Sequence, residues 1–509
     1  SSDLAPSDGN FLCNGLVNPD RGLHPAMAEV KYVHQNVGFD AIDAASGKFN
    51  ITNRFYFTNL KKYQIHYSVL ANGKTVKSGK VSLDIAPQAS KEFTVPVNGL
   101  KARPGTEYFV NFSVIAVEPE PLIPAGYEIA YDQFRLPVEA ERNTYKANGP
   151  ALQTQTQGDE LTVSSSKVNF VFNKKSGLVT SYKVDGTEYF KDGFGIQPNF
   201  WRAPNDNDYG NGAPKRLHVW KQSSKDFHVT DTKVSTEDKA VLLQATYLLA
   251  AGNLYVVTYK IYPSGIVHVN AKFTSTDMQA AETEVSEATR MATFTPGSDA
   301  ARKAASKLEV PRIGVRFRLP AQMNNVQYFG RGPEENYIDR NHGTMVGIYQ
   351  TTADKMYFNY VRPQENGHHT DTRWLNLSPD KGNGLVIVAD SLIGFNALRN
   401  SVEDFDSEEA LPHPYQWNNF SPEEAANHDE KAARNVLRRM HHVNDVTPRD
   451  FVEVCVDMKQ QGVGGYDSWG ARPEPFHQIP ANREYNWGFT LVPIRSGSQA
   501  TEAAKYDYR

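Results

Sequence analysis

The segment Phe451-Val-Glu-Val-Cys-Val-Asp-Met458 is a short apolar run, and the glycine-rich stretch Gln461-Gly-Val-Gly-Gly-Tyr-Asp-Ser-Trp-Gly470 follows it closely. An apolar run of this length with three valines predicts a buried β-strand. Gly462, Gly464 and Gly465 allow backbone conformations that other residues avoid, and they leave room for another group to come close. The two segments therefore predict a core strand that ends in a tight loop carrying Trp469.

Two interpretations of Trp469 are open from these residues alone. An indole on a glycine-rich loop is well placed to act as a flat apolar platform for a ligand such as a sugar ring. A loop tryptophan also commonly fills the end of a sandwich, buried against the neighbouring strands. The other motifs of the chain favour the first interpretation.

The composition is typical of a globular protein of two to four domains. The chain has 509 residues, which exceeds one ordinary domain, with 39% hydrophobic and 22% charged residues. No apolar run approaches the roughly 18 residues of a membrane span. The net charge of −4 and the dispersed Lys and Arg residues argue against a nucleic-acid partner. Cys13 and Cys455 are far apart and form neither a disulfide framework nor a CxxC metal pair.

Residues 27–137 show strand patterns throughout, with nothing helical of useful length. Val110, Phe112 and Val114 alternate with their neighbours, and Asn72-Gly73 is typical of a tight hairpin turn. Strand-length runs recur about every ten residues, which predicts an immunoglobulin-like sandwich. The preceding residues 1–26 contain too few apolar residues for a core of their own.

Residues 138–158 lose the alternation and are predicted to be a linker. From 159 to 497 strand patterns resume without βαβ alternation, which predicts one large antiparallel sandwich, and 498–509 read as a tail. The exception is 421–440, where Ser421-Pro-Glu-Glu has the signature of a helix start and predicts a helical surface insertion. The expected fold class is therefore all-β, an immunoglobulin-like sandwich followed by a large antiparallel β-supersandwich.

Three polar motifs are candidates for chemistry. Arg202, Asp206 and Asp208 lie in a turn-forming segment, where they either hydrogen-bond sugar hydroxyls or pair with each other to hold the loop. Glu334 and Glu335 are adjacent, so on an extended backbone they point to opposite faces and make a poor pair of glycosidase carboxylates. We expect a structural role for that Gly-Pro turn.

The third motif contains His368, His369 and Asp371. Adjacent histidines lack the i, i+4 spacing of a helical zinc site, and no HExxH is present, so metal binding is the weaker interpretation. A site within the large sandwich would need His368 or Glu365 to meet another titratable group on an accessible face.

Taken in order, six motifs resemble those of the large bacterial β-galactosidases of glycoside hydrolase family 2. They are Asp8-Gly-Asn-Phe-Leu-Cys-Asn-Gly-Leu-Val17, Asp20-Arg-Gly-Leu-His-Pro-Ala26, Arg202-Ala-Pro-Asn-Asp-Asn-Asp208, Gly330-Arg-Gly-Pro-Glu-Glu-Asn-Tyr337, Pro363-Gln-Glu-Asn-Gly367 and Gly462-Val-Gly-Gly-Tyr-Asp-Ser-Trp469. The resemblance covers nearly the whole chain.

The resemblance implies that this chain is the C-terminal part of such an enzyme: the end of the catalytic barrel (1–26), the second immunoglobulin-like domain and the large C-terminal sandwich, which in this family is galactose-mutarotase-like. Both catalytic glutamates of the retaining mechanism would lie before residue 1. The chain alone is therefore expected to contain no catalytic residue and to be inactive. Its role would be to support the assembly and one side of the active site.

The resemblance also assigns three residues. Trp469 matches the family's aromatic platform, which stacks on the sugar, and Phe11 and Asn14 match a pair that ligates an active-site sodium. The remaining protein ligand comes from an absent domain, so two ligands alone would not hold sodium here. The resemblance implies no cofactor for this chain alone and allows sodium and magnesium in the full-length enzyme. Tyr466, where the family commonly has Asp or Asn, and a longer segment at 401–440 depart from the pattern.

The expected function is hydrolysis of terminal β-D-galactosides in the full-length enzyme, with this chain supplying the stacking Trp469. Its expected partners are the galactoside, the missing N-terminal and barrel domains and further copies in a homo-oligomer, with neither nucleic acid nor membrane. The alternative is a free-standing carbohydrate-binding or scaffold protein of two β-sandwiches. No signal peptide is recognisable in residues 1–10, and the compartment stays open between cytoplasm and periplasm.

Overall fold

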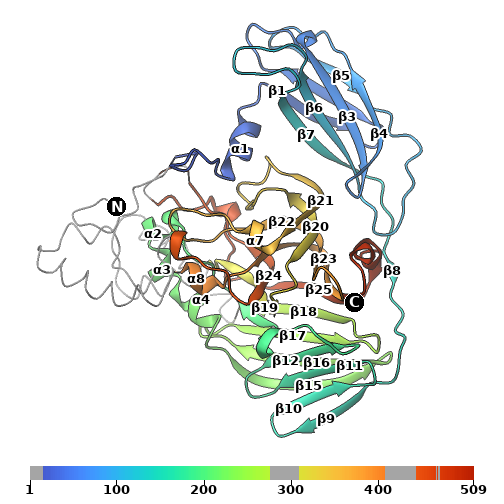
Figure 1. Cartoon of the computed structure of the whole chain (residues 1–509), viewed down its shortest axis with the longest axis vertical. Coiled ribbons are helices and arrows are strands. Elements are labelled where there is room, and N and C mark those ends of the chain that lie inside the picture. The colour runs from blue at the N-terminus through green and yellow to red at the C-terminus, as the bar shows by residue number, and fades with distance from the viewer. Residues whose placement is uncertain (1–14, 276–308, 407–442, 466, 468–469) are drawn as a thin grey trace, which may run out of the picture.

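The computed structural model describes residues 15–275, 309–406, 443–465, 467 and 470–509. It has two β-rich bodies, one at the N-terminal side and one much larger (Figure 1). The all-β prediction is confirmed. The predicted helical insertion at 421–440 lies outside the described residues.

The smaller body is a two-sheet sandwich of seven antiparallel strands, as the alternating pattern predicts. One sheet has the order β1-β2-β5 and the other the order β4-β3-β6-β7. Their inward-facing aromatic and branched side chains form one core, in which Phe39 stacks on Phe112 at 4.8 Å between ring centroids. The strands are β1 (Val37–Asp43), β2 (Lys48–Asn53), β3 (Tyr63–Ala71), β4 (Lys74–Val81), β5 (Ser90–Thr94), β6 (Tyr108–Ala116) and β7 (Glu128–Leu136), with the 3-10 turn η1 (Leu60–Lys62) before β3.

A short helix, α1 (Ala26–Val33), precedes this sandwich, so the prediction that residues 27–137 contain nothing helical of useful length is wrong. The helix is eight residues long, has no side-chain cap and buries no residue completely. Such a helix lacks the apolar stripe and the capping residue by which helices are recognised in a sequence. Its Glu29 side chain accepts a hydrogen bond from the Gly343 amide at 2.7 Å, which ties it to the larger body.

The larger body packs a five-stranded sheet against a twelve-stranded one, and every strand pair within these two sheets is antiparallel. The five-stranded sheet has the order β13-β12-β11-β10-β9, with β9 (Gln153–Gln157), β10 (Glu160–Ser164), β11 (Val168–Asn173), β12 (Leu178–Val184) and β13 (Thr187–Glu188). All five residues of β9 are exposed, which explains why this polar strand reads as part of a linker in the sequence.

The large sheet follows the order β14-β19-β24-β23-β25-β18-β17-β16-β15, and β20, β21 and β22 extend it from β23. Its strands are β14 (Gln197–Asn199), β15 (His228–Glu237), β16 (Ala240–Leu248), β17 (Leu254–Ile261), β18 (Val267–Thr274), β19 (Arg312–Pro320), β20 (Asn325–Gly332), β21 (Met345–Thr352), β22 (His369–Ser378), β23 (Gly384–Leu398), β24 (Phe451–Gln460) and β25 (Tyr485–Ile494). The predicted core strand at 451–458 is thus β24, between β19 and β23.

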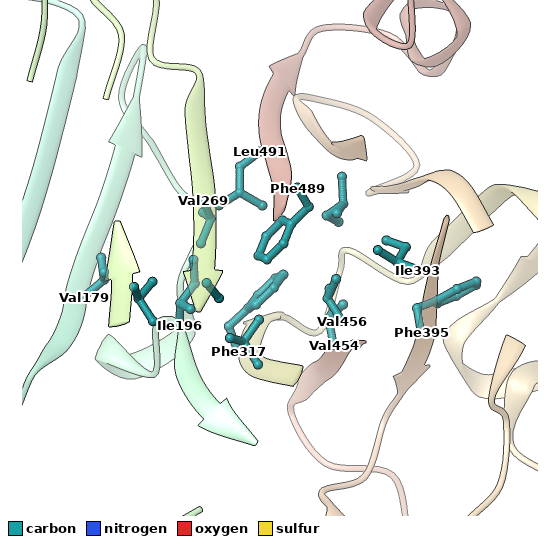
Figure 2. Packing of buried hydrophobic residues seen from close by; sticks show 14 of the residues in the cluster. Val179, Ile196, Val269, Phe317, Ile393, Phe395, Val454, Val456, Phe489 and Leu491 are labelled. Atoms are coloured by element: carbon teal, nitrogen blue, oxygen red, sulfur yellow. The ribbon is translucent and has the colours of Figure 1, made fainter. Parts of the chain in front are cut away.

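Apolar side chains from both sheets share one core (Figure 2). Val179 of β12 lies on the side of the smaller sheet, whereas Phe489 of β25 and Val456 of β24 come from the larger one. Because alternate residues of β24 point into this core, the strand fixes where the following loop begins.

Short helices and turns connect the strands of the larger body. They are η2 (Lys191–Gly193), α2 (Asp206–Gly210), α3 (Ala213–Arg216), α4 (His218–Ser223), α7 (Ala353–Met356), α8 (Val402–Phe405), η4 (Val443–Asp445), η5 (Pro475–His477), η6 (Gly497–Gln499) and α10 (Ala500–Ala503). No helix in the described part of the chain is long and apolar enough to cross a membrane.

The last residues do not form a loose tail. Strand β26 (Tyr506–Asp507) pairs in parallel with β8 (Asn143–Thr144), which lies in the segment predicted to be a linker. The Tyr262 hydroxyl donates to the Tyr508 carbonyl oxygen at 2.6 Å. The two ends of the larger body therefore close on each other.

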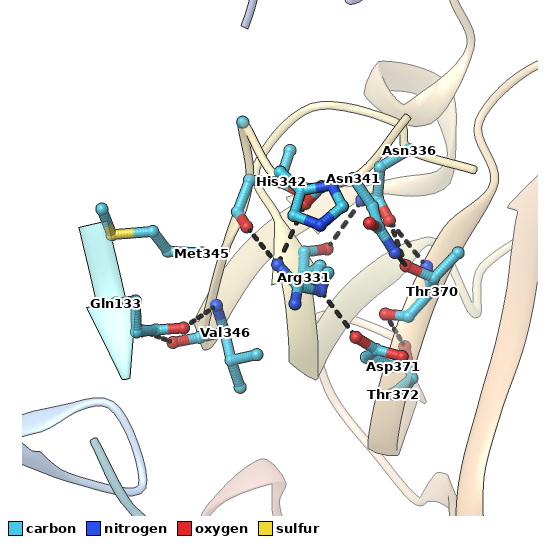
Figure 3. Close-up of polar contacts among 12 residues, drawn as sticks. Gln133, Arg331, Asn336, Asn341, His342, Met345, Val346, Thr370, Asp371 and Thr372 are labelled. Carbon is cyan, nitrogen blue, oxygen red and sulfur yellow. Dashed lines mark hydrogen bonds and ion pairs between the residues drawn. The ribbon is translucent and has the colours of Figure 1, made fainter. Parts of the chain in front are cut away.

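Specific polar contacts join the two bodies. Gln133 of β7 makes a pair of hydrogen bonds with the main chain of Val346 on β21, at 2.9 and 2.8 Å (Figure 3). The Arg373 guanidinium forms a bidentate ion pair with Glu107, with Nε and Nη2 at 2.8 and 2.9 Å from the two carboxylate oxygens. Because each of these contacts has two hydrogen bonds, it fixes the relative orientation of the two bodies as well as the distance between them.

Candidate functional site

The loop after β24 begins at Gln461, as the sequence predicts. Positive φ angles and close contacts with neighbouring residues explain why glycines occupy several of its positions. Gly464 and Gly465 have φ angles of +67° and +120°. A Cβ on Gly462 would lie 2.4 Å from Asp339 Oδ2, and one on Gly470 would lie 2.3 Å from the Gly210 carbonyl carbon. Any larger residue at these positions would push the loop away from its neighbours.

Asp339 holds the start of this loop. Its Oδ1 accepts a hydrogen bond from the Val463 amide at 3.0 Å, and its Oδ2 accepts one from the Gly464 amide at 2.8 Å. Charge-assisted bonds to two successive amides fix the backbone direction of the loop. Asp339 itself lies in the connection between β20 and β21.

The β20–β21 connection is held in turn by Arg331 (Figure 3). The Arg331 Nη1 donates to the carbonyl oxygens of Asn341 and Thr344 at 3.0 and 2.8 Å, while its Nε lies 2.6 Å from Asp371 Oδ2. Asp371 therefore pairs with an arginine and orients a turn. Asn336, in the same connection, accepts from the Thr370 amide at 2.9 Å and ties it to β22.

Arg202 holds the same loop from the other side. Its side chain is 2% exposed and forms a two-point ion pair with Asp208, with Nε and Nη2 at 3.1 and 2.9 Å from the carboxylate oxygens. Its remaining donors reach the carbonyl oxygens of Gln461 at 2.8 Å and Gly462 at 3.1 Å. Of the two interpretations of this motif, the structure supports the one in which Arg202 and Asp208 hold a loop, although the loop they hold is 461–462.

Asp208 has a second task, because it caps α2. Its Oδ2 accepts from the Asn205 amide at 3.2 Å, and the Asn205 side chain accepts from the Asp208 amide at 2.8 Å. This reciprocal capping box explains why the segment from 206 to 210 is a helical turn. Gly210 at the end of this turn is the residue that Gly470 approaches.

Asp206 differs from Asp208 in that its side chain reaches the surface. Its carboxylate is 46% exposed, and its Oδ1 lies 3.6 Å from Arg362 Nη1. The Arg362 guanidinium lies over the Tyr209 ring, 3.9 Å from its centroid. Burial raises the pKa of Asp206, and Arg362 opposes that shift. This part of the motif presents charged and hydrogen-bonding groups beside the loop.

The adjacent glutamates do not form a catalytic pair, as predicted. Glu335 is buried and accepts hydrogen bonds from the Tyr360 hydroxyl at 2.5 Å and the Gly367 amide at 2.6 Å, and it pairs with Arg340 at 3.0 Å, whereas Glu334 is exposed. Burial raises the pKa of Glu335, and Arg340 opposes that rise. The role of Glu335 is to fasten the 333–340 turn to the segment at 360–367.

His368 and Glu365 do meet other titratable groups, but in the sealed interior. Arg312 and Asp457 are 0% exposed and His368 is 1% exposed. Arg312 Nε lies 3.2 Å from Asp457 Oδ2, and Arg312 Nη2 lies 3.1 Å from Glu365 Oε1. The same Nη2 also contacts the side-chain oxygens of Asn396 and Gln460.

Burial raises the pKa of Asp457 to about 7, and burial together with Arg312 keeps the pKa of His368 well below its usual value. A sugar needs an open face to reach an acid and a base, and these side chains offer none. No cluster of three potential metal ligands occurs among the described residues, so the histidines give no support to a metal site there.

The residues that the resemblance assigns are not described. Trp469, Phe11 and Asn14 lie outside the described residues, as does Tyr466, and their roles stay predictions. The structure describes what flanks Trp469: Gly462 to Gly465 before it, and Gly470 and Ala471 after it, where the Ala471 amide donates to Asp467 at 3.0 Å.

Sequence reasoning missed two neighbours of this loop. Asp339 lies just beyond the motif that ends at Tyr337, and nothing local shows that an aspartate in a turn will bind amides more than a hundred residues away. The aromatic side chain of Phe476 in η5 is 72% exposed. The carbonyl oxygen of the adjacent His477 accepts a hydrogen bond from the Gly462 amide at 2.9 Å. In the sequence, only its position seven residues after Trp469 indicates that Phe476 could lie near the loop.

Comparison with known proteins identifies the family to which the chain belongs. A family model described as the β-galactosidase small chain matches residues 164–491, which is more than half of the chain. The chain belongs to the β-galactosidase small-chain family. A second model, described as β-galactosidase domain 4, matches residues 49–137, the region of the smaller sandwich.

Two relatives that match nearly all of this chain are named β-galactosidases. That of Priestia megaterium is 32% identical over 492 residues, and that of Streptococcus thermophilus is 26% identical over 495 residues, each covering 96% of this chain. The chain spans only 42% and 41% of those two relatives.

Among solved structures, a galactose mutarotase related enzyme from Lactobacillus acidophilus aligns over 66% of this chain and 97% of its own. The identity is 9% and the TM-score 0.31, a likeness too slight to add to the assignment.

Proposed function

We propose that this chain is the non-catalytic part of a β-galactosidase, an enzyme that hydrolyses terminal β-D-galactosides. Within that enzyme the chain presents Trp469 as a stacking surface for the sugar and supports the assembly. The relatives that match nearly all of this chain are named β-galactosidases, and the chain spans about two fifths of their length. The catalytic carboxylates would then belong to the portion of the enzyme outside this chain.

The observation that carries the proposal is the way the 461–470 loop is held. Asp339 binds two of its amides, Arg202 binds two of its carbonyls, and Gly470 lies against Gly210. Two segments far apart in sequence, 202–210 and the β20–β21 connection, thus converge on one short loop. A loop whose ends are fixed in this way can hold one side chain in a defined position with little entropic cost on binding.

The surroundings of the loop suit a sugar. Asp206 is the first residue of α2 and is 46% exposed, and the side chain of Arg362, 21% exposed, lies next to it; a carboxylate and a guanidinium are able to bond hydroxyl groups. An aromatic ring stacks on the apolar face of a pyranose while such polar groups bind its edge. The buried Arg312–Asp457 cluster offers neither feature.

Activity measurements test the proposal. The purified chain alone should not turn over nitrophenyl β-galactoside, whereas the enzyme that contains it should. Turnover by the pure chain would overturn the assignment of the catalytic groups to another portion.

The rival, a free-standing carbohydrate-binding or scaffold protein, predicts a different result. It requires that the chain bind a galactoside tightly without a partner and that adding the catalytic portion leave this affinity unchanged. Under our proposal the chain alone binds galactosides weakly, because one aromatic surface without the rest of the pocket buries little of the sugar.

A further inference from the structure

A separate cavity lies on the larger body, away from the 461–470 loop. It has a volume of about 290 Å³ and is formed by the β12–β13 turn, the turn before β18 and the segment that follows β25. Binding pockets for small molecules begin at about 300 Å³, so this cavity matches a single sugar ring and is too small for an oligosaccharide.

The floor and walls of the cavity are built from ordered groups. Tyr189 is 1% exposed and donates its hydroxyl to the Gly384 carbonyl oxygen at 3.3 Å. The Ser264 hydroxyl accepts from Tyr145 at 2.7 Å, and the Asn383 amide donates to Thr187 Oγ1 at 2.9 Å. Val184 and Pro493 add apolar surface. The cavity thus offers an apolar wall together with fixed hydroxyl and amide groups.

The charges at its mouth do not balance. Lys167 Nζ and Arg495 Nη2 lie 3.8 and 3.6 Å from the same oxygen, Oδ2 of Asp185. One carboxylate faces two cations, so one positive charge is left over. Neither side chain donates a hydrogen bond at normal distance to any residue that the structure describes, and the Arg495 side chain is 82% exposed. Both cations therefore keep donors for a ligand.

We propose that this cavity is a second binding site, for a monosaccharide that carries one anionic group. The ring lies against Val184 and Pro493, its hydroxyls bond Ser264 and Asn383, and its anion lies between Lys167 and Arg495. A guanidinium matches the two oxygens of a carboxylate or of a phosphate equally well. Uronates and sugar phosphates share this chemistry. The site is independent of the function proposed above, because no residue of the 461–470 loop lines it.

Titration calorimetry of the purified chain tests the site with galacturonate, galactose 6-phosphate, galactose and inorganic phosphate at low salt. We expect at least one acidic sugar to bind, with an affinity at least about tenfold above those of galactose and inorganic phosphate. Binding of galacturonate alone would identify a uronate site, and binding of the phosphate alone a sugar-phosphate site. The absence of binding by both at concentrations up to about 20 mM would overturn the proposal.

Variants locate the binding. Arg495→Gln and Lys167→Gln should each weaken binding of the acidic sugar by about tenfold, because each removes one charge-assisted hydrogen bond. The matched control is Lys183→Gln, which removes an exposed lysine of β12 that does not line the cavity. Equal losses in the control, or equal binding of inorganic phosphate and sugar phosphate, would overturn the assignment of a sugar site.

Discussion

Two buried ionic networks lie side by side in the larger body, and they differ in where their remaining donors go. Arg202 pairs with Asp208 and directs its other N–H groups to the main-chain carbonyls of Gln461 and Gly462. Arg312 pairs with Asp457 and Glu365, and its remaining donors reach the side-chain oxygens of Asn396 and Gln460 and, at 3.3 Å, the Trp201 carbonyl oxygen. The first network fixes the loop that contains Trp469, whereas the second joins interior side chains to one main-chain carbonyl, that of Trp201.

This difference shows that a cluster of charged residues in a β-sandwich can be structural. His, Glu, Asp and Arg gathered together look like a catalytic group in a sequence, yet around Arg312 they lie in the buried interior. The loop network contains fewer titratable groups, and its importance follows from the main-chain atoms it binds. Accessible surface and backbone contacts separate the two more clearly than the number of charges does.

The largest expected effect is on the closed network. Arg312→Met would leave Asp457 and Glu365 without their cation, and breaking a buried pair in this way costs about 3–5 kcal/mol. The urea midpoint for unfolding of the larger body should fall accordingly. Adding Asp457→Leu should recover part of the loss, because the second change removes the uncompensated charge. A loss below about 1 kcal/mol for Arg312→Met would show that the network is not important for stability.

The second effect is a dependence on pH. Burial raises the pKa of Asp457 from its usual 3.8 to about 7. Between these values the folded protein binds more protons than the unfolded one, so the contribution of Asp457 to stability is present at low pH and is lost as pH rises toward 7. The loss is roughly 4 kcal/mol. The difference in unfolding free energy between the protein and Asp457→Asn should change over this range and be flat above it.

An equal pH dependence of the two proteins would contradict that assignment and would indicate that Arg312 keeps Asp457 ionised throughout. In that case the two networks would be electrostatically alike, and only their backbone contacts would distinguish them.

The third and smallest effect is on the loop. Asp339→Asn keeps one acceptor but places an amide N–H group against a backbone N–H, so it should cost about 1–2 kcal/mol and should raise KM for galactosides in the whole enzyme. Asp206→Asn, a change at a partly exposed carboxylate, is the control for stability and should alter it by less than about 0.5 kcal/mol. Equal KM values for Asp339→Asn and the unmodified enzyme would show that the contacts of Asp339 with the loop do not affect sugar binding.

The strands were largely predictable because their side chains alternate. Strands β6, β17, β18, β19 and β24 coincide with apolar or alternating runs, and the hairpin turn at Asn72-Gly73 has the positive φ angles, 46° and 75°, that these residues favour. Helix α1 and strand β9 were missed because one has no cap and no buried residue, and the other is polar on both faces. Local pattern carries no signal for such elements.

The candidate site was predictable only in its parts. The sequence marked the 202–208 motif, the 330–337 motif and the 461–470 loop separately, and the resemblance assigned all three to one family without predicting that they come together in space. Arg202 and Asp339 both bind the same loop, through contacts between residues more than a hundred positions apart. Local spacing in a sequence does not predict such contacts. For the same reason the sequence left open whether Arg202 and Asp208 bind a sugar or hold a loop.

We propose that the anchored loop presents Trp469 to the sugar of a β-galactosidase. The most direct measurement is KM and kcat for nitrophenyl β-galactoside in the enzyme containing this chain, with Trp469→Ala compared to Trp469→Phe. We predict that Trp469→Ala raises KM by about tenfold and that Trp469→Phe, which keeps a stacking ring, raises it less. An unchanged KM for Trp469→Ala would contradict the account.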